Sequence, residues 1–231
     1  LLRIDPVEVR FNERGLTGLG CFADPEQAAR HGVFCAGADG RVRSFLQKPS
    51  PAKQAAGGAV NRYGQSILDI GVMNFDAETA IRMLRLCGVG AGPEKNLAWS
   101  GLIAEAIETL GLDFYCEFCC AMGTEATPDS HADAAAAAGS RWGREALRRV
   151  FESLSATPFH VQLLPHCEFI DFGSTRQLIS SGANLLRAER GVSRLDTCLG
   201  IQNNIAPPGA ILGASAWVEA CDIRARLACG G

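Results

Sequence analysis

The stretch SILDIGVMNF, residues 66–75, and the stretch DAETAIRMLRLCG, residues 76–88, which follows it directly, together indicate the fold class. The first stretch is an apolar run with the length and composition of a strand. Asp76 stands where a helix N-cap is expected, and Gly88 stands where that helix should end. Apolar residues share one face of the predicted helix, namely Ile81, Leu84 and Cys87. A strand followed at once by a capped helix is typical of layered α/β domains.

Segments on both sides continue this alternation. The sequence predicts a short helix within 23–32, a hairpin over 33–47, a helix within 100–111, another within 141–154, a strand at 159–165 and a strand that passes into a helix over 168–186. We therefore expect an α/β layered domain. Residues 123–140, GTEATPDSHADAAAAAGS, are small and polar without a period, and there we expect a surface loop or an insertion.

Composition restricts the class of ligand. The chain has 231 residues, of which 47% are hydrophobic and 20% charged, as in soluble globular proteins. Its formal net charge is −3, and no basic run offers an electrostatic footprint for nucleic acid or for an anionic membrane. No apolar run approaches the roughly 20 residues that span a bilayer, and residues 1–10 lack the pattern of a signal peptide. We expect small ligands and a cytoplasmic location.

The ten cysteines are irregularly spaced, which favours reduced thiols over a disulfide framework in a chain of this length. The cluster CEFCC contains Cys116, Cys119 and Cys120 at the spacing of a zinc knuckle or a redox motif. No second pair follows at the spacing of metal ligands. We therefore interpret these cysteines as apolar positions of a buried segment.

A six-residue period appears near the end of the sequence. Apolar residues recur at Leu199, Ile205, Ile211, Trp217, Ile223 and Cys229, with small residues such as Gly209 and Gly213 between them. A parallel β-helix has this signature, because each short face of a coil presents one inward apolar side chain. We expect residues 196–231 to form its first coils, and we expect a truncated chain because the run stops within a coil.

Lys48 lies at the end of a predicted strand, in RVRSFLQKPSP, residues 41–51. Pro49 cannot donate a ladder hydrogen bond, and it restricts the residue before it to an extended backbone. A lysine in this position is a flexible point charge suited to a phosphate. The alternative is an ordinary solvated surface lysine.

Five motifs occur in the order HGVF, FLQKPS, LDIGVMNF, EFIDFGSTRQLISS and AWVEAC. This ordered set resembles the sugar nucleotidyltransferases with a C-terminal left-handed β-helix. It is most similar to the GDP-fucose pyrophosphorylase family, which includes bifunctional fucokinase/fucose-1-phosphate guanylyltransferase enzymes. The resemblance implies a partial Rossmann-like nucleotidyltransferase domain at 1–195, the sugar-phosphate part, followed by the β-helix at 196–231.

The resemblance also implies roles for single residues. Lys48, in the K-P motif, matches the lysine that contacts the phosphate of the sugar 1-phosphate and is the implied catalytic residue. Asp69 and Gly71 match the strand that lines the sugar pocket, although Asp69 could instead serve a turn or a cap. Asp171 matches a position that several related enzymes use for Mg²⁺, and the alternative is a carboxylate that caps the turn at Gly173.

The implied reaction joins GTP and L-fucose 1-phosphate to give GDP-L-fucose and pyrophosphate, with Mg²⁺ as cofactor. Such enzymes bind the triphosphate through a glycine-rich loop with a following arginine and lysine, and no such loop occurs in this sequence. We therefore expect this chain alone to be inactive. A fused kinase domain downstream is possible in the parent protein. The four histidines, His31, His131, His160 and His166, are expected to be structural.

Two other functions stay open from the sequence. A non-catalytic sugar-phosphate-binding or interaction module could keep the fold without the nucleotide loop. A hexapeptide acyltransferase would use the β-helix as its catalytic body, but few coils are present and no histidine lies in the periodic segment.

Overall fold

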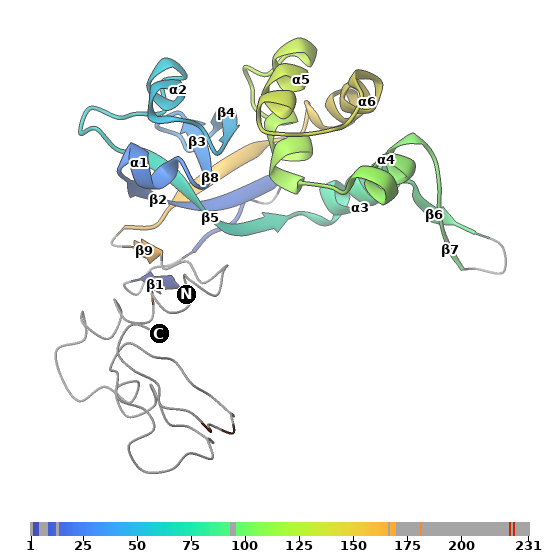
Figure 1. Ribbon diagram of the computed structural model, residues 1–231, viewed down its shortest axis with the longest axis horizontal. Helices are drawn as coiled ribbons and strands as arrows, with labels where there is room; N and C mark the ends of the chain where they lie inside the picture. The colour runs from blue at the N-terminus through green and yellow to red at the C-terminus, as the bar shows by residue number, and fades with distance from the viewer. Residues whose placement is uncertain are drawn as a thin grey trace. The chain divides into compact units, whose positions relative to one another are not determined.

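The computed structural model describes residues 2–4, 9–12, 14–92, 96–165, 167–169, 181, 222 and 224. The chain divides into two compact units, one formed by Ile4–Glu168 and the other by Leu1–Arg3 with Phe169–Gly231. Nearly all described residues belong to the first unit, which carries the labelled helices and the central sheet in Figure 1. The predicted β-helix at 196–231 lies outside the described residues, apart from Asp222 and Arg224.

A five-stranded mixed sheet forms the centre of the first unit. Its strand order is β4-β3-β5-β2-β8. The strands are β2 (Leu16–Ala23), β3 (Gly32–Ala36), β4 (Val42–Gln47), β5 (Ser66–Phe75) and β8 (Phe159–Leu163). β2 pairs in parallel with β8, whereas the pairs β2–β5, β3–β4 and β3–β5 are antiparallel. The predicted α/β class and the predicted hairpin are therefore confirmed, while the Rossmann-like arrangement stays a prediction because this mixed sheet does not establish it.

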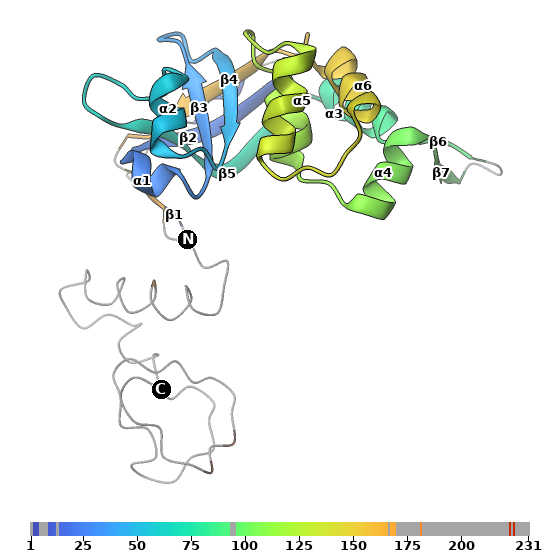
Figure 2. The same cartoon turned by 45° about the horizontal axis from the view of Figure 1, so that its top comes forward.

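The described residues form six α-helices, of which the sequence predicts four. They are α1 (Pro25–Ala28), α2 (Pro51–Ala56), α3 (Ala77–Leu86), α4 (Leu102–Leu110), α5 (Pro128–Ala137) and α6 (Arg144–Leu154). Phe114–Phe118 form a π-helical turn, and Cys119–Ala121 form a short 3₁₀ turn. A further strand pair is β6 (Val89–Ala91) with β7 (Leu97–Trp99), and two short strands are β1 (Leu2–Ile4) and β9 (Cys167–Phe169). Figures 1 and 2 both show α5 and α6 over one face of the sheet, and α1 and α2 beside the β3–β4 hairpin.

Aromatic rings form the core between the sheet and the helices. The ring centroids of Phe34 and Phe45 lie 5.2 Å apart, and those of Phe34 and Phe159 lie 5.8 Å apart, both in edge-to-face contact. Val150 and Leu154 of α6 are fully buried in the same cluster. Each such side chain contributes about 1.5–3 kcal/mol when it leaves water, so this cluster fixes the helices on the sheet.

The prediction of a surface loop or an insertion at 123–140 is wrong for the loop, because residues 128–137 form α5. Thr127 and Ser130 form a reciprocal capping box, with N···O distances of 2.8 and 3.1 Å. Pro128 occupies the first helical position, where its missing N–H costs no bond. Alanine has the highest helix propensity of all residues, so the run that follows forms a helix without an apolar period.

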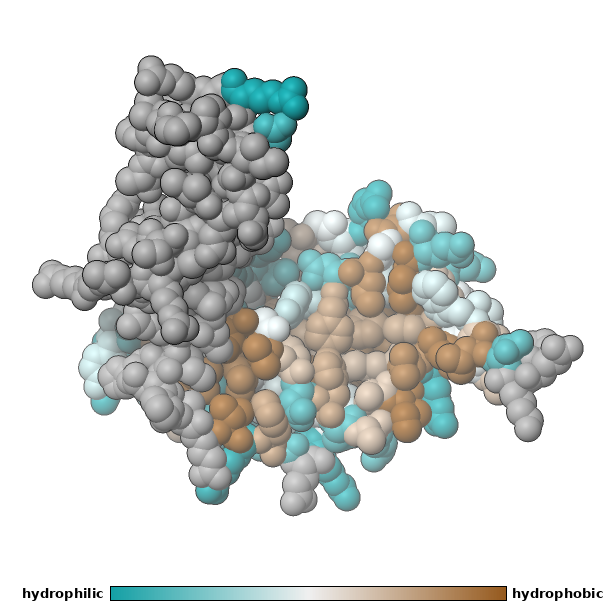
Figure 3. Space-filling view, turned by 90° about the horizontal axis from the view of Figure 1, so that it is seen from below, coloured by the Kyte–Doolittle hydropathy of each residue, from teal (hydrophilic) through white to brown (hydrophobic). Residues whose placement is uncertain are grey.

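One predicted helix face is exposed. α3 begins after Asp76, which accepts a hydrogen bond from the backbone N–H of Thr79 at 2.7 Å, as an N-cap should. However, Ile81 and Leu84 on this helix are 48% and 52% exposed, whereas Met83 is buried. Figure 3 shows that apolar surface also extends over one face of the molecule.

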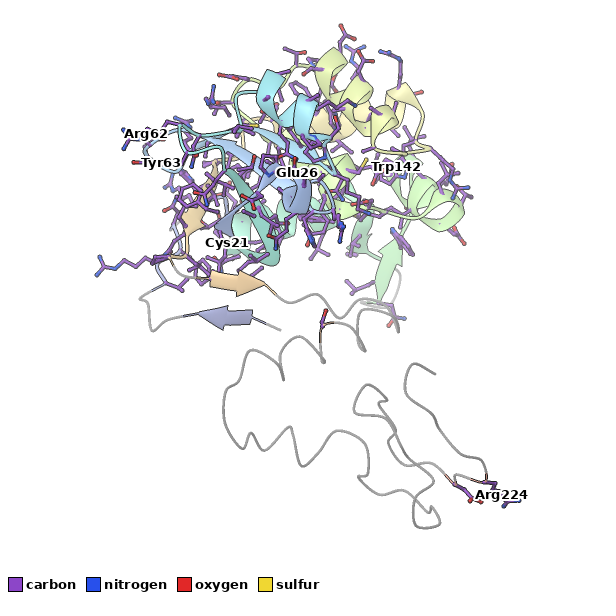
Figure 4. The ribbon with its side chains drawn as sticks, turned by 60° about the vertical axis from the view of Figure 1, so that its left-hand side comes forward. Cys21, Glu26, Arg62, Tyr63, Trp142 and Arg224 are labelled. Atoms are coloured by element: carbon purple, nitrogen blue, oxygen red, sulfur yellow. The ribbon has the colours of Figure 1, made fainter. Side chains whose placement is uncertain are left out.

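The cysteine prediction is confirmed. Cys116, Cys119 and Cys120 are buried, and the described cysteines are free thiols. Trp142, labelled in Figure 4, is buried as well, and its indole N–H donates to the carbonyl of Gly111 at 2.8 Å, which ties the start of α6 to the end of α4. Within the described ranges, no helix combines the length and the apolar character that crossing a membrane requires.

Gly15 joins the starts of β2, β8 and α3, and it offers a test of the fold. Its φ is +83°, and a Cβ added there would lie 2.0 Å from the carbonyl oxygen of Pro158. Gly64 has a similar φ of +78° with nothing within 4 Å of an added Cβ. We expect Gly64→Ala to lower the free energy of unfolding by about 1–2 kcal/mol through backbone strain alone. Gly15→Ala should lower it by more than about 3 kcal/mol, because strain and a backbone clash add.

Equilibrium unfolding in urea measures both values. Equal losses in the two variants would show that the contact between Gly15 and Pro158 is not tight.

Candidate functional site

Lys48 directly follows the last residue of β4 and is exposed. Its backbone N–H donates to the carbonyl of His31 at 3.0 Å, which closes the open end of the β3–β4 hairpin. The predicted extended backbone is wrong, because the φ of Lys48 is +46°. It is the one non-glycine residue with positive φ in the described part of the chain. A left-handed non-glycine residue costs about 1–3 kcal/mol and persists only where its surroundings fix it.

The side chain of Gln54 holds the turn at Lys48 in this conformation. Its side chain is fully buried, and its Nε2 donates to the carbonyl of Pro49 at 3.0 Å and to that of Pro25 at 2.8 Å. Its Oε1 accepts from the hydroxyl of Ser66 at 2.7 Å. One carboxamide therefore joins α2, the end of the Lys48–Pro49 turn, the start of α1 and β5. The sequence reasoning missed Gln54, because nothing in its local pattern predicts contacts so far along the chain.

Lys48 lines a cavity of about 500 Å³ between α2 and α5. The polar lining consists of Gln47, Lys48, Ser50 and Lys53, and the apolar lining consists of Leu46, Pro49, Ala56, Ala134, Ala137 and Ala138. None of these residues carries a carboxylate. The Oε1 atom of Gln47 is buried and has no hydrogen-bond partner among the described residues.

Asp69 lies in the middle of β5 and is only 5% exposed. Its Oδ1 accepts a hydrogen bond from the backbone N–H of Gly71 at 3.0 Å. Burial removes the carboxylate from water and raises the pKa of Asp69 to about 7, although the bond from Gly71 opposes the shift. The side chain of Asp69 therefore bonds the backbone of the turn at Gly71, and Asp69 can carry a proton near neutral pH.

Gly71 and Tyr115 complete this second part of the site. Gly71 has a φ of +78°, and a Cβ added to it would lie 3.7 Å from the hydroxyl of Tyr115. The ring of Tyr115 stacks on Phe45 with centroids 6.1 Å apart. Burial, and then the charge of Asp69, raise the pKa of the Tyr115 phenol. Tyr115 was not predicted, since its position beside β5 depends on the turn at 114–118.

Gln47 connects the two parts. Its Nε2 donates to Oδ2 of Asp113 at 3.4 Å, and Oδ1 of Asp113 accepts from the backbone N–H groups of Tyr115 and Cys116 at 3.0 and 3.2 Å. Asp69 does not line the Lys48 cavity. It lies beside Gly32, the strand partner of Gln47, because a Cβ added to Gly32 would be 3.2 Å from the Cβ of Asp69.

The predicted metal ligand, Asp171, lies outside the described residues. In the part of the chain that is described, no three His, Cys, Asp or Glu side chains form a group that could hold a metal ion. The carboxylates of Asp69 and Asp113 accept hydrogen bonds from backbone N–H groups. These residues alone therefore do not supply the oxygen ligands that Mg²⁺ requires.

Two of the histidines have a lowered pKa. His131 is buried, and its Nε2 donates to the carbonyl of Glu117 at 2.9 Å. Burial lowers the pKa of His131. Burial also lowers the pKa of His160, and the charge of Arg41 lowers it further by a smaller amount. His131 therefore bonds to the backbone inside the core, which agrees with the predicted structural role.

A comparison with protein families gives one match. The model of the family described as the fucose pyrophosphorylase domain matches residues 1–227. A search of curated proteins gave no significant match.

Asp69 makes stability depend on pH. The folded chain keeps its proton up to about pH 7, whereas an unfolded aspartate loses it near pH 3.8, so this group destabilises the fold as pH rises through that window. We expect Asp69→Asn to raise the free energy of unfolding by about 3–4 kcal/mol at pH 8 and by about 1–2 kcal/mol at pH 5, where less of the window has been crossed. Urea unfolding at both pH values measures the difference. Asp24→Asn, at an exposed position, controls for the loss of one negative charge. If Asp69→Asn raised the free energy of unfolding equally at both pH values, the buried proton on Asp69 would be contradicted.

The backbone of Lys48 can be tested apart from its amine. Lys48→Ala and Lys48→Gly both remove the ammonium group, but only glycine adopts positive φ without strain. We expect the glycine variant to be more stable than the alanine variant by about 1 kcal/mol. Differential scanning calorimetry measures this gap. If alanine were the more stable of the two, the left-handed conformation would be wrong.

Proposed function

The chain belongs to the fucose pyrophosphorylase domain family, and from this premise we propose that its described unit binds L-fucose 1-phosphate for reaction with GTP to give GDP-L-fucose and pyrophosphate. The family consists of nucleotidyltransferases that make GDP-fucose, so the chemistry is attack of the sugar phosphate on the α-phosphorus of a nucleoside triphosphate. The sugar phosphate is already a nucleophile, and no general base is needed. The protein then acts by positioning and by charge stabilisation.

The observation that carries this proposal is the cavity beside Lys48. It is the size of a small-molecule site, it has cations and no carboxylate in its lining, and its key lysine has a strained backbone held by the buried amide of Gln54. Strain of this kind concentrates at binding and catalytic sites, because the surrounding structure determines it. Lys48 is thereby placed before the ligand arrives, so that binding does not have to order the turn.

Lys48 donates charge-assisted hydrogen bonds to the phosphate of the sugar and holds it for attack. Asp69 and Gly71 are the proposed contacts to sugar hydroxyls, since Asp69 can donate a hydrogen bond below about pH 7 and accept one above it. Mg²⁺ is the proposed cofactor, with Asp171 as a proposed ligand; when bound it offsets the charge of the triphosphate.

Calorimetric titration of the purified chain with L-fucose 1-phosphate tests the role of Lys48. We expect Lys48→Ala to weaken binding by about tenfold or more, as is usual for loss of a hydrogen bond between charged groups. Lys48→Arg should recover part of the affinity at most, because a planar fork does not replace a point charge in a fitted site.

The control variant is Arg85→Ala, which removes an exposed cation on α3 away from the cavity. No binding of L-fucose 1-phosphate by the parent chain, or equal binding by the parent and Lys48→Ala, would refute the proposed function.

A further inference from the structure

Lysine is rare in this chain, and two of its lysines lie in one place. Of the 22 basic residues only three are lysine, namely Lys48, Lys53 and Lys95, and the others are arginine. Lys48 and Lys53 both line the cavity between α2 and α5, and Lys95 lies outside the described residues. Arginine is therefore the usual surface cation here, so a pair of lysines in one cavity indicates a need for compact point charges.

Local structure does not account for Lys53. The N-cap of α2 is Ser50, whose side chain accepts from the backbone N–H of Lys53 at 3.3 Å. The third helical position, where a capping box would have Glu or Gln, is thus occupied by a lysine. Its side chain is exposed and does not pack into the core. The next residue, Gln54, is the buried amide that also bonds Pro49, so the start of α2, where Lys53 lies, is tied to the residue that follows Lys48.

Among the described residues, the lining of the cavity offers neither cation a counter-charge. Neither Lys48 nor Lys53 forms an ion pair with a residue that the structure describes, although ion pairs occur elsewhere, as between Arg43 and Glu125. The opposite wall consists of Ala134, Ala137 and Ala138, which carry no charge. Two like charges in one concave site repel each other, and a doubly negative ligand would remove that repulsion.

We propose that Lys53 is the second cation of the phosphate site, so that the phosphate of the sugar 1-phosphate binds between the ammonium groups of Lys48 and Lys53. This inference rests on the proposed function of the same cavity. A sugar phosphate carries close to two negative charges at neutral pH, which matches two ammonium groups. The hydroxyl of Ser50 can donate a third hydrogen bond, since its oxygen already accepts from the Lys53 backbone.

Binding of two ligands by the purified chain tests the inference. L-Fucose 1-phosphate is titrated by calorimetry, and methyl L-fucoside, which has no phosphate, is followed by ligand-observed NMR. We expect Lys53→Ala to weaken the binding of L-fucose 1-phosphate by about tenfold and to leave methyl L-fucoside unaffected. Lys53→Gln, which retains a long polar side chain, should lose as much as alanine. In the double variant with Lys48→Ala the loss should differ from the product of the single losses, because both lysines hold one phosphate.

The outcomes separate the two proposals. If Lys48→Ala weakens binding and Lys53→Ala behaves like the control Arg85→Ala, the second cation is refuted and the proposed function stands. Equal loss of both ligands in Lys53→Ala would also overturn the inference, since it would show a structural effect. If the parent chain does not bind L-fucose 1-phosphate, the proposed function itself fails, and the role of Lys53 fails with it.

Discussion

The carboxamide of Gln54 is the interaction on which the candidate site depends. Its amide nitrogen bonds two carbonyls, those of Pro25 and Pro49, and its oxygen accepts from Ser66. A buried polar group that loses its partner costs about 1–3 kcal/mol, so the turn after β4 cannot swing away without leaving several such groups unpaired. This is why a left-handed lysine can persist at Lys48 in place of glycine. The strained backbone of Lys48 and the buried hydrogen bonds of Gln54 belong together, because Gln54 ties the turn after Lys48 to β5 of the sheet.

The site separates two electrostatic environments. Asp69 is withdrawn from water inside the sheet, where its neutral form is favoured up to about pH 7. Lys48 and Lys53 are exposed in a cavity without carboxylates. A neutral hydrogen-bonding group suits sugar hydroxyls, whereas unpaired ammonium groups suit a phosphate. In the proposed complex, the two halves of the sugar phosphate would meet matching surroundings at β5 and at the end of β4, two strands that are separated by β3.

Sequence reasoning predicted the elements whose signals are local. β5, α3 with its cap at Asp76, and the β3–β4 hairpin all follow from apolar runs, caps and turns. It failed for α5, where alanine gives helix propensity but no apolar period, and a strong cap at Thr127 was overlooked. It failed for the backbone of Lys48, because the preference imposed by Pro49 is a local rule that Gln54 overrides through tertiary contacts. Lys48, Asp69 and Gly71 were found by resemblance, whereas Gln54 and Tyr115 depend on contacts between distant segments.

Hydrogen bonds also connect α5 with β4 on the two sides of the cavity, and they help the site to keep its shape. His131 and Ala135 of α5 are bonded to the turn at 114–118, through the carbonyl of Glu117 at 2.9 Å and the thiol of Cys116 at 3.4 Å. That turn is capped by Asp113, which accepts from Gln47 of β4 at 3.4 Å. A continuous path of hydrogen bonds therefore runs from α5 through Cys116 and Asp113 to Gln47, the residue before Lys48. The π-helical geometry of the turn, which is uncommon and often found at functional sites, places Tyr115 toward Gly71 while keeping this path intact. Because the strand, the turn and α5 share these bonds, the width of the cavity is determined by the buried core rather than by its exposed lysines.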